Sequence, residues 1–369
     1  MTLMKKIDYL EGLRGMCCFI VLIDHCVNSF KPDLRFTSLT SFGGEIRRII
    51  GWGPLNLIYS GIAPVCIFFI LSGFVLSLKF NSVNEHDVIF KGIIKRYPRL
   101  VLPVLASMIL MYAVFSLFNL FTDYRSNLTI ANVIKESLYF VPFEHVVLTN
   151  YAMWTISFEV YGSFLVFGLL ASVSVKETKL WIYCIVLIFL YLQGSYYCLF
   201  IAGMIFSDIF SRGKYHISKT KRLILFIVGL ILATSPYPRS GVEVYGGLYE
   251  YIQIFSFLEY KDVYRYLMLT GSIFIFSAIL GSGLFESFAD YKYFRFLGKI
   301  SFPLYITHSI FINVFAYVLH RFNPEVSFTI FVAVTFLTII TCLVVAAIFE
   351  RFVDLPSIKI ANIIANKFK

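Results

Sequence analysis

The chain has 369 residues, of which 59% are hydrophobic and 15% charged, and its mean hydropathy is +0.79. A soluble domain carries closer to about a quarter charged residues, so this composition excludes an ordinary soluble enzyme and predicts a multi-pass membrane protein. The net charge of +10 does not indicate nucleic-acid binding, because Lys and Arg lie mostly in short loops between apolar segments. The seven Cys lie in apolar segments without CxxC spacing, which predicts neither a disulfide framework nor a zinc site.

Ten apolar segments, most of about 20 residues, are candidates for membrane spans. We expect them to form one all-α polytopic bundle that comprises residues 1–369 as a single domain. The predicted spans are 9–30, 56–78, 100–121, 152–173, 180–195, 197–211, 222–236, 266–284, 300–320 and 327–349. With the N-terminus in the cytoplasm, Lys and Arg favour the cytoplasmic segments about two to one, which predicts that both termini are cytoplasmic.

The first predicted span carries Arg14 and His25 inside an apolar run, and ionisable side chains within a membrane helix indicate function. Their separation is close to three full helical turns, so they share one face, roughly 16 Å apart along the axis. A cation and an imidazole on one stripe indicate a single pocket for a long charged ligand. A mechanism in which Arg14 grips the ligand and His25 does the proton chemistry depends on that pocket, and separate cavities would contradict it. The alternative is a snorkelling arginine and a histidine packed between helices.

A basic cluster follows the second predicted span, in the sequence KGIIKRYPRLVLP. We expect Arg96 and Arg99 to hold phosphate groups on the cytoplasmic side, because the planar guanidinium forms forked contacts with phosphates. The alternative is that these charges only orient the protein or contact anionic lipid headgroups. Arg14 faces the same side of the membrane, which favours a shared phosphate site.

The fourth predicted span contains MWTISFEVYG, in which Glu159 lies within an apolar helix. An intramembrane carboxylate needs a partner. His25 is one candidate, because a carboxylate beside an imidazole orients the ring and raises its basicity. The alternative is a hydrogen-bonded structural carboxylate. Trp154 and Ser157 of the same segment are candidates for acceptor contact or support.

A further polar patch is predicted in the ninth span, GKISFPLYITHSIF. Tyr305 and His308 are three residues apart and share a helix face, where they are candidates to support the site. A packed, hydrogen-bonded histidine is the alternative for His308. The sequence has no Walker, GxGxxG or HExxH motif, so we expect no bound cofactor and no metal.

Four stretches, in this order, resemble the membrane-bound acyltransferase-3 family. They are YLEGLRGMCCFIVLIDH with Arg14 and His25, FFILSGFVLSLKF and the following KRYPRL with Arg96 and Arg99, MWTISFEVYG with Trp154, Ser157 and Glu159, and GKISFPLYITHS with the later FERFVDLP. The resemblance implies an integral enzyme of the bacterial cytoplasmic (inner) membrane. Such an enzyme takes an acyl group, most often acetyl, from cytoplasmic acyl-CoA and passes it to a sugar hydroxyl on a lipid-linked or surface polysaccharide.

Within this resemblance the expected partners are acyl-CoA, a glycan acceptor and membrane lipids, and no nucleic acid. Arg14, Arg96 and Arg99 would hold the phosphates of coenzyme A, which acts as donor substrate. His25, oriented by Glu159, would take the proton of the acceptor hydroxyl as it attacks the thioester carbonyl. Such proton transfer contributes about 100- to 10,000-fold to a rate. An acyl-imidazole intermediate is the alternative.

The competing class of function is a transporter or flippase of a glycan or small polar substrate, because intramembrane charges serve both classes. A transporter more often has two related halves with helices broken at Gly or Pro, and the sequence shows no clear internal repeat. A non-catalytic membrane scaffold or sensor is a third interpretation.

Overall fold

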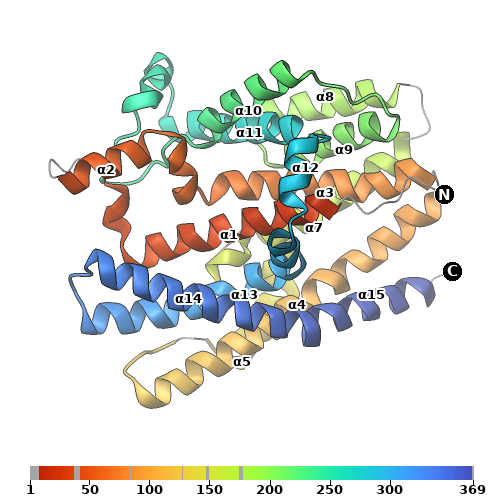
Figure 1. Cartoon of the computed structure of the whole chain (residues 1–369). Coiled ribbons are helices and arrows are strands. Elements are labelled where there is room, and N and C mark those ends of the chain that lie inside the picture. The colour runs from red at the N-terminus through yellow and green to blue at the C-terminus, as the bar shows by residue number, and fades with distance from the viewer. Residues whose placement is uncertain are drawn as a thin grey trace.

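The computed structural model describes residues 8–36, 42–83, 85–126, 128–146, 149–173 and 178–367. Within these ranges every regular element is a helix, which confirms the predicted all-α fold (Figure 1). The long helices are α1 (Asp8–Phe30), α3 (Ile62–Val83), α4 (His86–Phe121), α7 (Trp154–Val173), α8 (Lys179–Leu192), α9 (Tyr197–Ser211), α10 (Lys219–Ala233), α11 (Tyr260–Ile279), α13 (Lys292–Phe322) and α14 (Phe328–Phe349).

Short helical elements connect these long helices or extend them. They are η1 (Pro32–Arg35), α2 (Phe42–Gly51), η2 (Pro54–Tyr59), α5 (Ile130–Lys135), η3 (Glu136–Phe140), α6 (Val141–Phe143), η4 (Tyr151–Met153), η5 (Gly247–Phe255), α12 (Gly283–Ala289), η6 (Glu350–Asp354) and α15 (Leu355–Lys367). The start of α1 and the end of α15 lie toward the same end of the bundle, and α2 lies at the other end (Figure 1).

Each of the ten predicted segments corresponds to one long helix, and the largest difference is at α4, which begins at His86 instead of residue 100. Five described segments are long and apolar enough to cross a membrane, and a sixth counts if α11 and α12, bent by 94°, form one span. α8 and α9 are apolar but shorter. The number of ten spans is therefore not confirmed, and it remains a prediction together with the cytoplasmic side of the termini.

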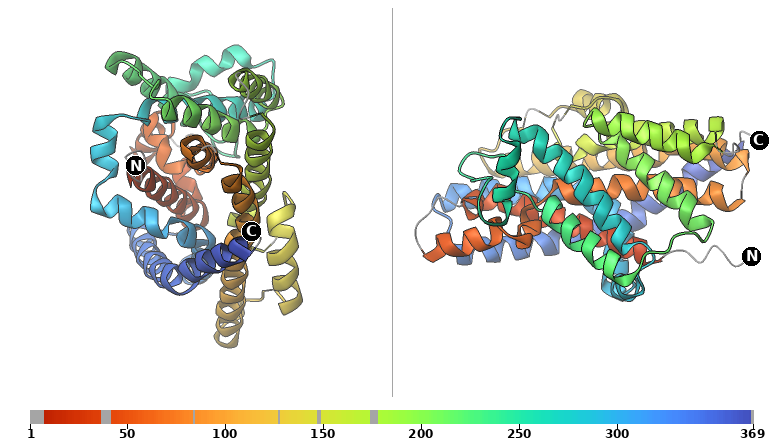
Figure 2. Two further views of the ribbon diagram at one scale, coloured as in Figure 1. Left: turned by 90° about the vertical axis from the view of Figure 1, so that its right-hand side faces the viewer. Right: turned by 90° about the horizontal axis from the view of Figure 1, so that it is seen from above.

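α1 and α3 lie in the middle of the bundle when it is viewed along the helices, with α10 and α11 on one side and α14 and α15 on the other (Figure 2). α1 packs on α13, and α3 packs on α9. Both contacts are made by glycines, because a Cβ at Gly15 would overlap Gly298, and a Cβ at Gly73 would overlap the backbone of Phe200. Small residues let membrane helices approach closely, and these glycines bring α1 against α13 and α3 against α9.

Candidate active site

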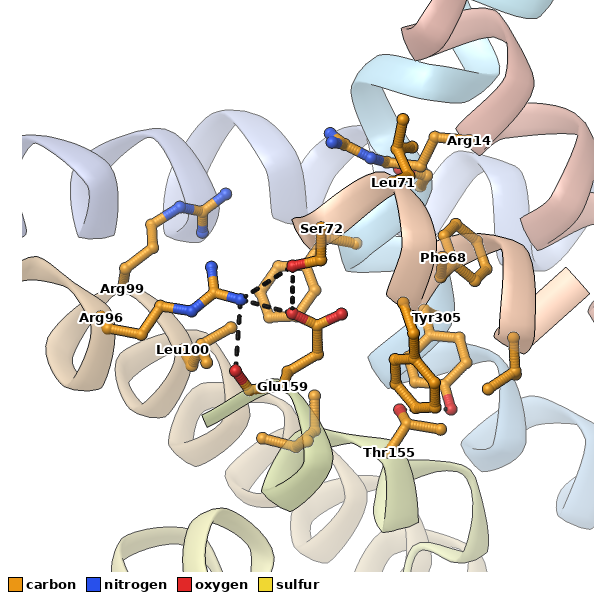
Figure 3. Close-up of a pocket in the computed structure, with 15 residues that line it drawn as sticks. Arg14, Phe68, Leu71, Ser72, Arg96, Arg99, Leu100, Thr155, Glu159 and Tyr305 are labelled. Carbon is orange, nitrogen blue, oxygen red and sulfur yellow. Dashed lines mark hydrogen bonds and ion pairs between the residues drawn. The ribbon is translucent and has the colours of Figure 1, made fainter. Parts of the chain in front are cut away.

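Arg14, Arg96 and Arg99 line one cavity of about 190 Å³, which we call the arginine cavity (Figure 3). Arg14 comes from α1, and the other two arginines come from adjacent turns of α4. Residues of α3, α7 and α13 complete the wall. The structure therefore brings together the three residues that the sequence predicted to bind phosphate.

Glu159 on α7 also lines the arginine cavity, where it forms an ion pair with Arg96 (Figure 3). Ser72 donates a hydrogen bond to Oε2 of Glu159 over 2.7 Å, and Arg96 Nε donates one to Ser163 Oγ over 2.8 Å. The predicted contact between Glu159 and His25 is therefore wrong. The carboxylate is already bound by a guanidinium and a hydroxyl, which satisfy a charge inside an apolar bundle better than a neutral imidazole does.

Arg99 forms a forked ion pair with Asp354, with N–O distances of 2.5 and 3.3 Å. Asp354 is the last residue of η6, a short π-helix between α14 and α15, and π-helical turns occur frequently at functional sites. Arg96 and Arg99 thus each have an acidic partner, whereas Arg14 has none among the residues that the structure describes. Glu11 and Glu159 interact electrostatically with Arg14 at longer range, and the arginine cavity keeps a net positive charge.

His25 lines a second cavity of about 280 Å³, the histidine cavity, together with Asp24 and Trp154. Its ring stacks on Tyr151 with the ring centroids 5.0 Å apart, and it meets His308 edge to face at 5.1 Å. Nε2 of His25 lies 4.0 Å from Oδ2 of Asp24. The two neighbouring rings hold the imidazole in place.

The arginine cavity and the histidine cavity are adjacent, and Val65 and Tyr305 line both. Thr155 donates a hydrogen bond to the Tyr305 hydroxyl over 2.8 Å, which holds the tyrosine in this wall. Arg14 and His25 therefore lie in separate cavities, and the predicted single pocket is wrong. The two residues lie eleven positions apart on α1, and Val65 of α3 and Tyr305 of α13 lie where the two cavities meet.

The other predicted residues divide between the cavities and their surroundings. Trp154 lines the histidine cavity, whereas Ser157 and His308 line neither cavity. Ser157 is fully buried, with Oγ 2.7 Å from Nδ1 of His145, a loop histidine to which the sequence assigned no role. His308 is buried, with Nδ1 3.0 Å from the backbone oxygen of Leu304. Both residues therefore contribute to the packing around the site.

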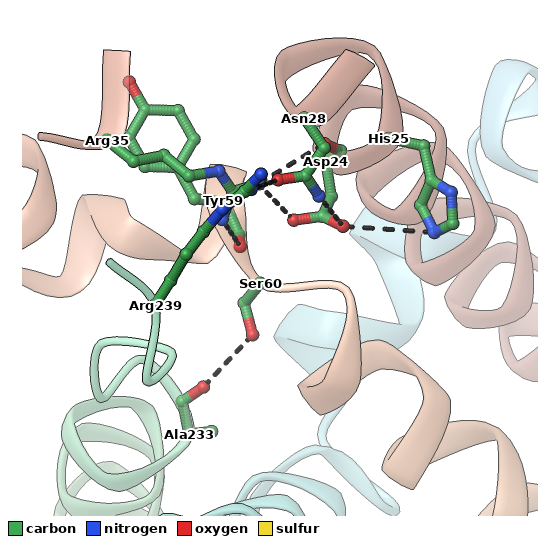
Figure 4. A network of polar contacts seen from close by, with 8 residues as sticks. All are labelled: Asp24, His25, Asn28, Arg35, Tyr59, Ser60, Ala233 and Arg239. Carbon is green, nitrogen blue, oxygen red and sulfur yellow. Dashed lines mark hydrogen bonds and ion pairs between the residues drawn. The ribbon is translucent and has the colours of Figure 1, made fainter. Parts of the chain in front are cut away.

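Two arginines of the histidine cavity, Arg35 and Arg239, were not predicted. Arg35 in η1 forms a buried ion pair with Asp24 over 2.5 Å (Figure 4). Arg239, in the loop before η5, donates a hydrogen bond to Asn28. Short elements such as η1 and irregular loops have no helical periodicity from which a shared site could be predicted. The available signal was Asp24, since a carboxylate inside an apolar helix needs a cationic partner.

An apolar helix bundle with charged side chains around two internal cavities is typical of a membrane protein, and intramembrane charges of this kind indicate function. A sequence model of the family described as an acyltransferase domain matches residues 7–347, nearly the whole chain. The chain therefore belongs to the membrane-bound acyltransferase-3 family, as its four motifs predicted, and its activity is of the O-acyltransferase kind. Comparison with curated proteins and with solved structures gave no match.

Proposed function

We propose that this protein is an O-acyltransferase of the bacterial cytoplasmic membrane that moves an acyl group, most often acetyl, from acyl-CoA to a hydroxyl of a lipid-linked or surface polysaccharide. The observation that carries this proposal is the contact between the two cavities. The arginine cavity meets the histidine cavity at Val65 and Tyr305, in a chain of the acyltransferase-3 family. One cavity then serves the donor and the other serves the acceptor.

The donor side is supported by the charges of the arginine cavity. Coenzyme A carries several phosphate groups, and arginines bind phosphate through charge-assisted, forked hydrogen bonds. Arg14 offers a guanidinium without an acidic partner among the described residues, while the partners of Arg96 and Arg99 hold those two side chains in fixed positions. We therefore assign the phosphate-bearing part of acyl-CoA to this cavity.

The acceptor side is supported by the composition of the histidine cavity. His25 offers a proton acceptor, and Trp154 and Tyr237 offer aromatic faces, which suit sugar rings. The neutral imidazole is held by ring packing, so its lone pair stays in one place. A hydroxyl that binds beside His25 is therefore the group that receives the acyl chain.

The chemical step is an attack of the acceptor hydroxyl on the thioester carbonyl. The imidazole of His25 takes the hydroxyl proton as the new C–O bond forms, and the nearby Asp24 stabilises the resulting imidazolium. The tetrahedral intermediate then breaks its C–S bond, and the imidazolium returns the proton to the coenzyme A sulfur. The products are an ester on the sugar and free coenzyme A.

The wall between the cavities sets a condition on this mechanism. The thioester must reach from the arginine cavity to His25, and Val65 and Tyr305 stand between the two. We therefore propose that the acyl end of the donor passes between these two side chains. A small acyl group such as acetyl needs the least displacement of the wall.

The test is a transfer assay with purified protein in lipid vesicles, radiolabelled acetyl-CoA and surface polysaccharide from cells that lack this protein. We expect the label to appear on the polysaccharide as an alkali-labile ester. Movement of polysaccharide across the vesicle membrane without labelling would contradict the proposal and indicate a transporter. In cells, NMR or mass spectrometry of the surface glycan should show fewer O-acetyl groups when the protein is removed.

A further inference from the structure

We infer that the acceptor is an anionic glycan, one that carries an oxyanion, either a carboxylate or a phosphate, within reach of Arg239 when its hydroxyl lies at His25. This inference rests on the proposed function, since it treats the histidine cavity as the acceptor site. The charged side chains of the histidine cavity support this inference. Arg35 and Arg239 supply two guanidinium groups, and Asp24 supplies one carboxylate.

The carboxylate of Asp24 forms its shortest contact with Arg35. Its Oδ1 lies 2.5 Å from Nη2 of Arg35, and its Oδ2 accepts a hydrogen bond from the side-chain amide of Asn28 over 3.2 Å. Asp24 and Arg35 are 6% and 7% exposed, so this pair is buried in the wall of the cavity. One carboxylate cannot neutralise two guanidinium groups, so the cavity keeps a net positive charge even though Arg239 also interacts electrostatically with Asp24.

The guanidinium of Arg35 is held from several directions. It donates to the backbone oxygen of Tyr59 over 2.8 Å and stacks over the Tyr59 ring at 5.0 Å, in addition to its pair with Asp24. These contacts fix Arg35 as part of the scaffold. Arg35 therefore shapes the acceptor site, and Arg239 is the cation that remains for a ligand.

The hydrogen-bond partner of Arg239 is neutral, and its electrostatic interaction with Asp24 is shared with Arg35. It donates one hydrogen bond to Oδ1 of Asn28, and no acidic side chain among the described residues pairs with it. Figure 4 shows the guanidinium groups of Arg35 and Arg239 both directed toward Asp24 and Asn28. Because a guanidinium has five N–H donors, Arg239 keeps donors for an incoming oxyanion. Two like charges beside one carboxylate also repel each other, and a bound anion relieves that repulsion.

The positions of these groups suit a charged sugar. Arg239 and Tyr237 come from the same loop and line the histidine cavity with His25. A sugar ring beside Tyr237 would have its hydroxyl at His25 and its acidic substituent at Arg239. Recognition by a charge-assisted hydrogen bond would select acidic sugars or phosphate-linked units over neutral ones.

The experiment compares one polysaccharide in three forms as acceptor for radiolabelled acetyl-CoA. Surface polysaccharide from cells that lack the protein is used untreated, after carbodiimide–borohydride reduction of its carboxylates, or after hydrofluoric acid removal of its phosphates. We expect label on the untreated form and a loss of about 10- to 100-fold in kcat/KM after one treatment, which also identifies the source of the oxyanion. Equal labelling of all three forms would overturn the inference and leave the proposed function intact. No label on the untreated form would overturn the proposed function and the inference with it.

Variants of Arg239 give an independent readout with the untreated polysaccharide. Arg239→Gln should raise KM for the polysaccharide about 10- to 100-fold and leave KM for acetyl-CoA unchanged, while Arg239→Lys should retain part of the affinity. Arg125→Gln is the matched control, since Arg125 is an exposed loop arginine that lines neither cavity. An Arg239→Gln protein that is folded and has wild-type KM for the polysaccharide would overturn the inference.

Discussion

Glu159 pairs with Arg96 in the wall of the arginine cavity, and this pair keeps the carboxylate away from His25. The two side chains are 19% and 15% exposed, and Ser72 bonds to both of them. Glu159 therefore acts on the donor side of the site: it neutralises one arginine and fixes its direction. The imidazole depends instead on Asp24, Tyr151 and His308 for its position.

The first prediction concerns the stability that this ion pair provides. Glu159→Ala should destabilise the protein by about 3 kcal/mol, because removal of one partner leaves Arg96 charged and partly buried without compensation. A double variant, Arg96→Met with Glu159→Leu, should recover most of the stability. Thermal unfolding in detergent measures both. A Glu159→Ala protein as stable as the wild type would contradict the structural role of the pair.

Glu159→Gln distinguishes the pairing of Glu159 with Arg96 from the predicted role of Glu159 in orienting His25. The amide keeps a hydrogen-bond acceptor for Ser72 and for Arg96, so the folded variant should retain kcat within about tenfold, in line with the loss of one charged interaction. A positioning role toward His25 predicts a loss of kcat as large as that of a His25 variant. Measurement of kcat and KM for both substrates decides between these outcomes.

The second prediction concerns donor binding by Arg14. Arg14→Gln should raise KM for acetyl-CoA about 10- to 100-fold with little change in kcat, because the variant loses a charge-assisted contact to phosphate. Arg14→Lys should give an intermediate value, since lysine keeps the charge but not the forked geometry. Arg125→Gln serves again as the exposed control. An unchanged KM in a folded Arg14→Gln protein would remove Arg14 from the donor site.

The third prediction concerns the wall between the cavities. Val65→Phe should lower acetyl transfer strongly and leave acetyl-CoA binding unchanged, because the larger ring obstructs the passage between Val65 and Tyr305. Val65→Ala should keep transfer, since it widens the same passage. Overpacking destabilises a core by about 1–3 kcal/mol, so thermal unfolding must show that Val65→Phe is folded. A folded Val65→Phe protein with the wild-type transfer rate would show that the acyl group takes another path.

Sequence reasoning predicted the helical elements well, because apolar runs of about 20 residues leave a strong local signal. It also identified residues that line the two cavities, since a charge within an apolar helix is conspicuous wherever it occurs. Arg14, His25, Arg96, Arg99 and Glu159 all follow from that reasoning, and all five line one of the two cavities.

The partners of these charges could not be predicted in the same way. Arg99 pairs with Asp354, which is 255 residues away in the chain. Asp354 belongs to the π-helix η6, and the wider π-helical turn changes the direction of its side chain from the one that a continuous α-helix would predict. Arg35 ends the short 3-10 helix η1 and Arg239 lies in a loop, and neither segment is long enough or regular enough for a hydrophobic period to predict which way its side chains point. The division into two cavities depends on how Tyr305 packs between helices, which is a tertiary property.

The central claim is that His25 removes the proton of the acceptor hydroxyl, and His25→Ala tests it most directly. The measurement is the rate of acetyl transfer to polysaccharide at saturating acetyl-CoA, with acetyl-CoA binding and thermal unfolding measured on the same preparation. We predict a rate about 100- to 10,000-fold below wild type with unchanged donor binding. A folded His25→Ala protein that transfers acetyl at the wild-type rate would contradict the account.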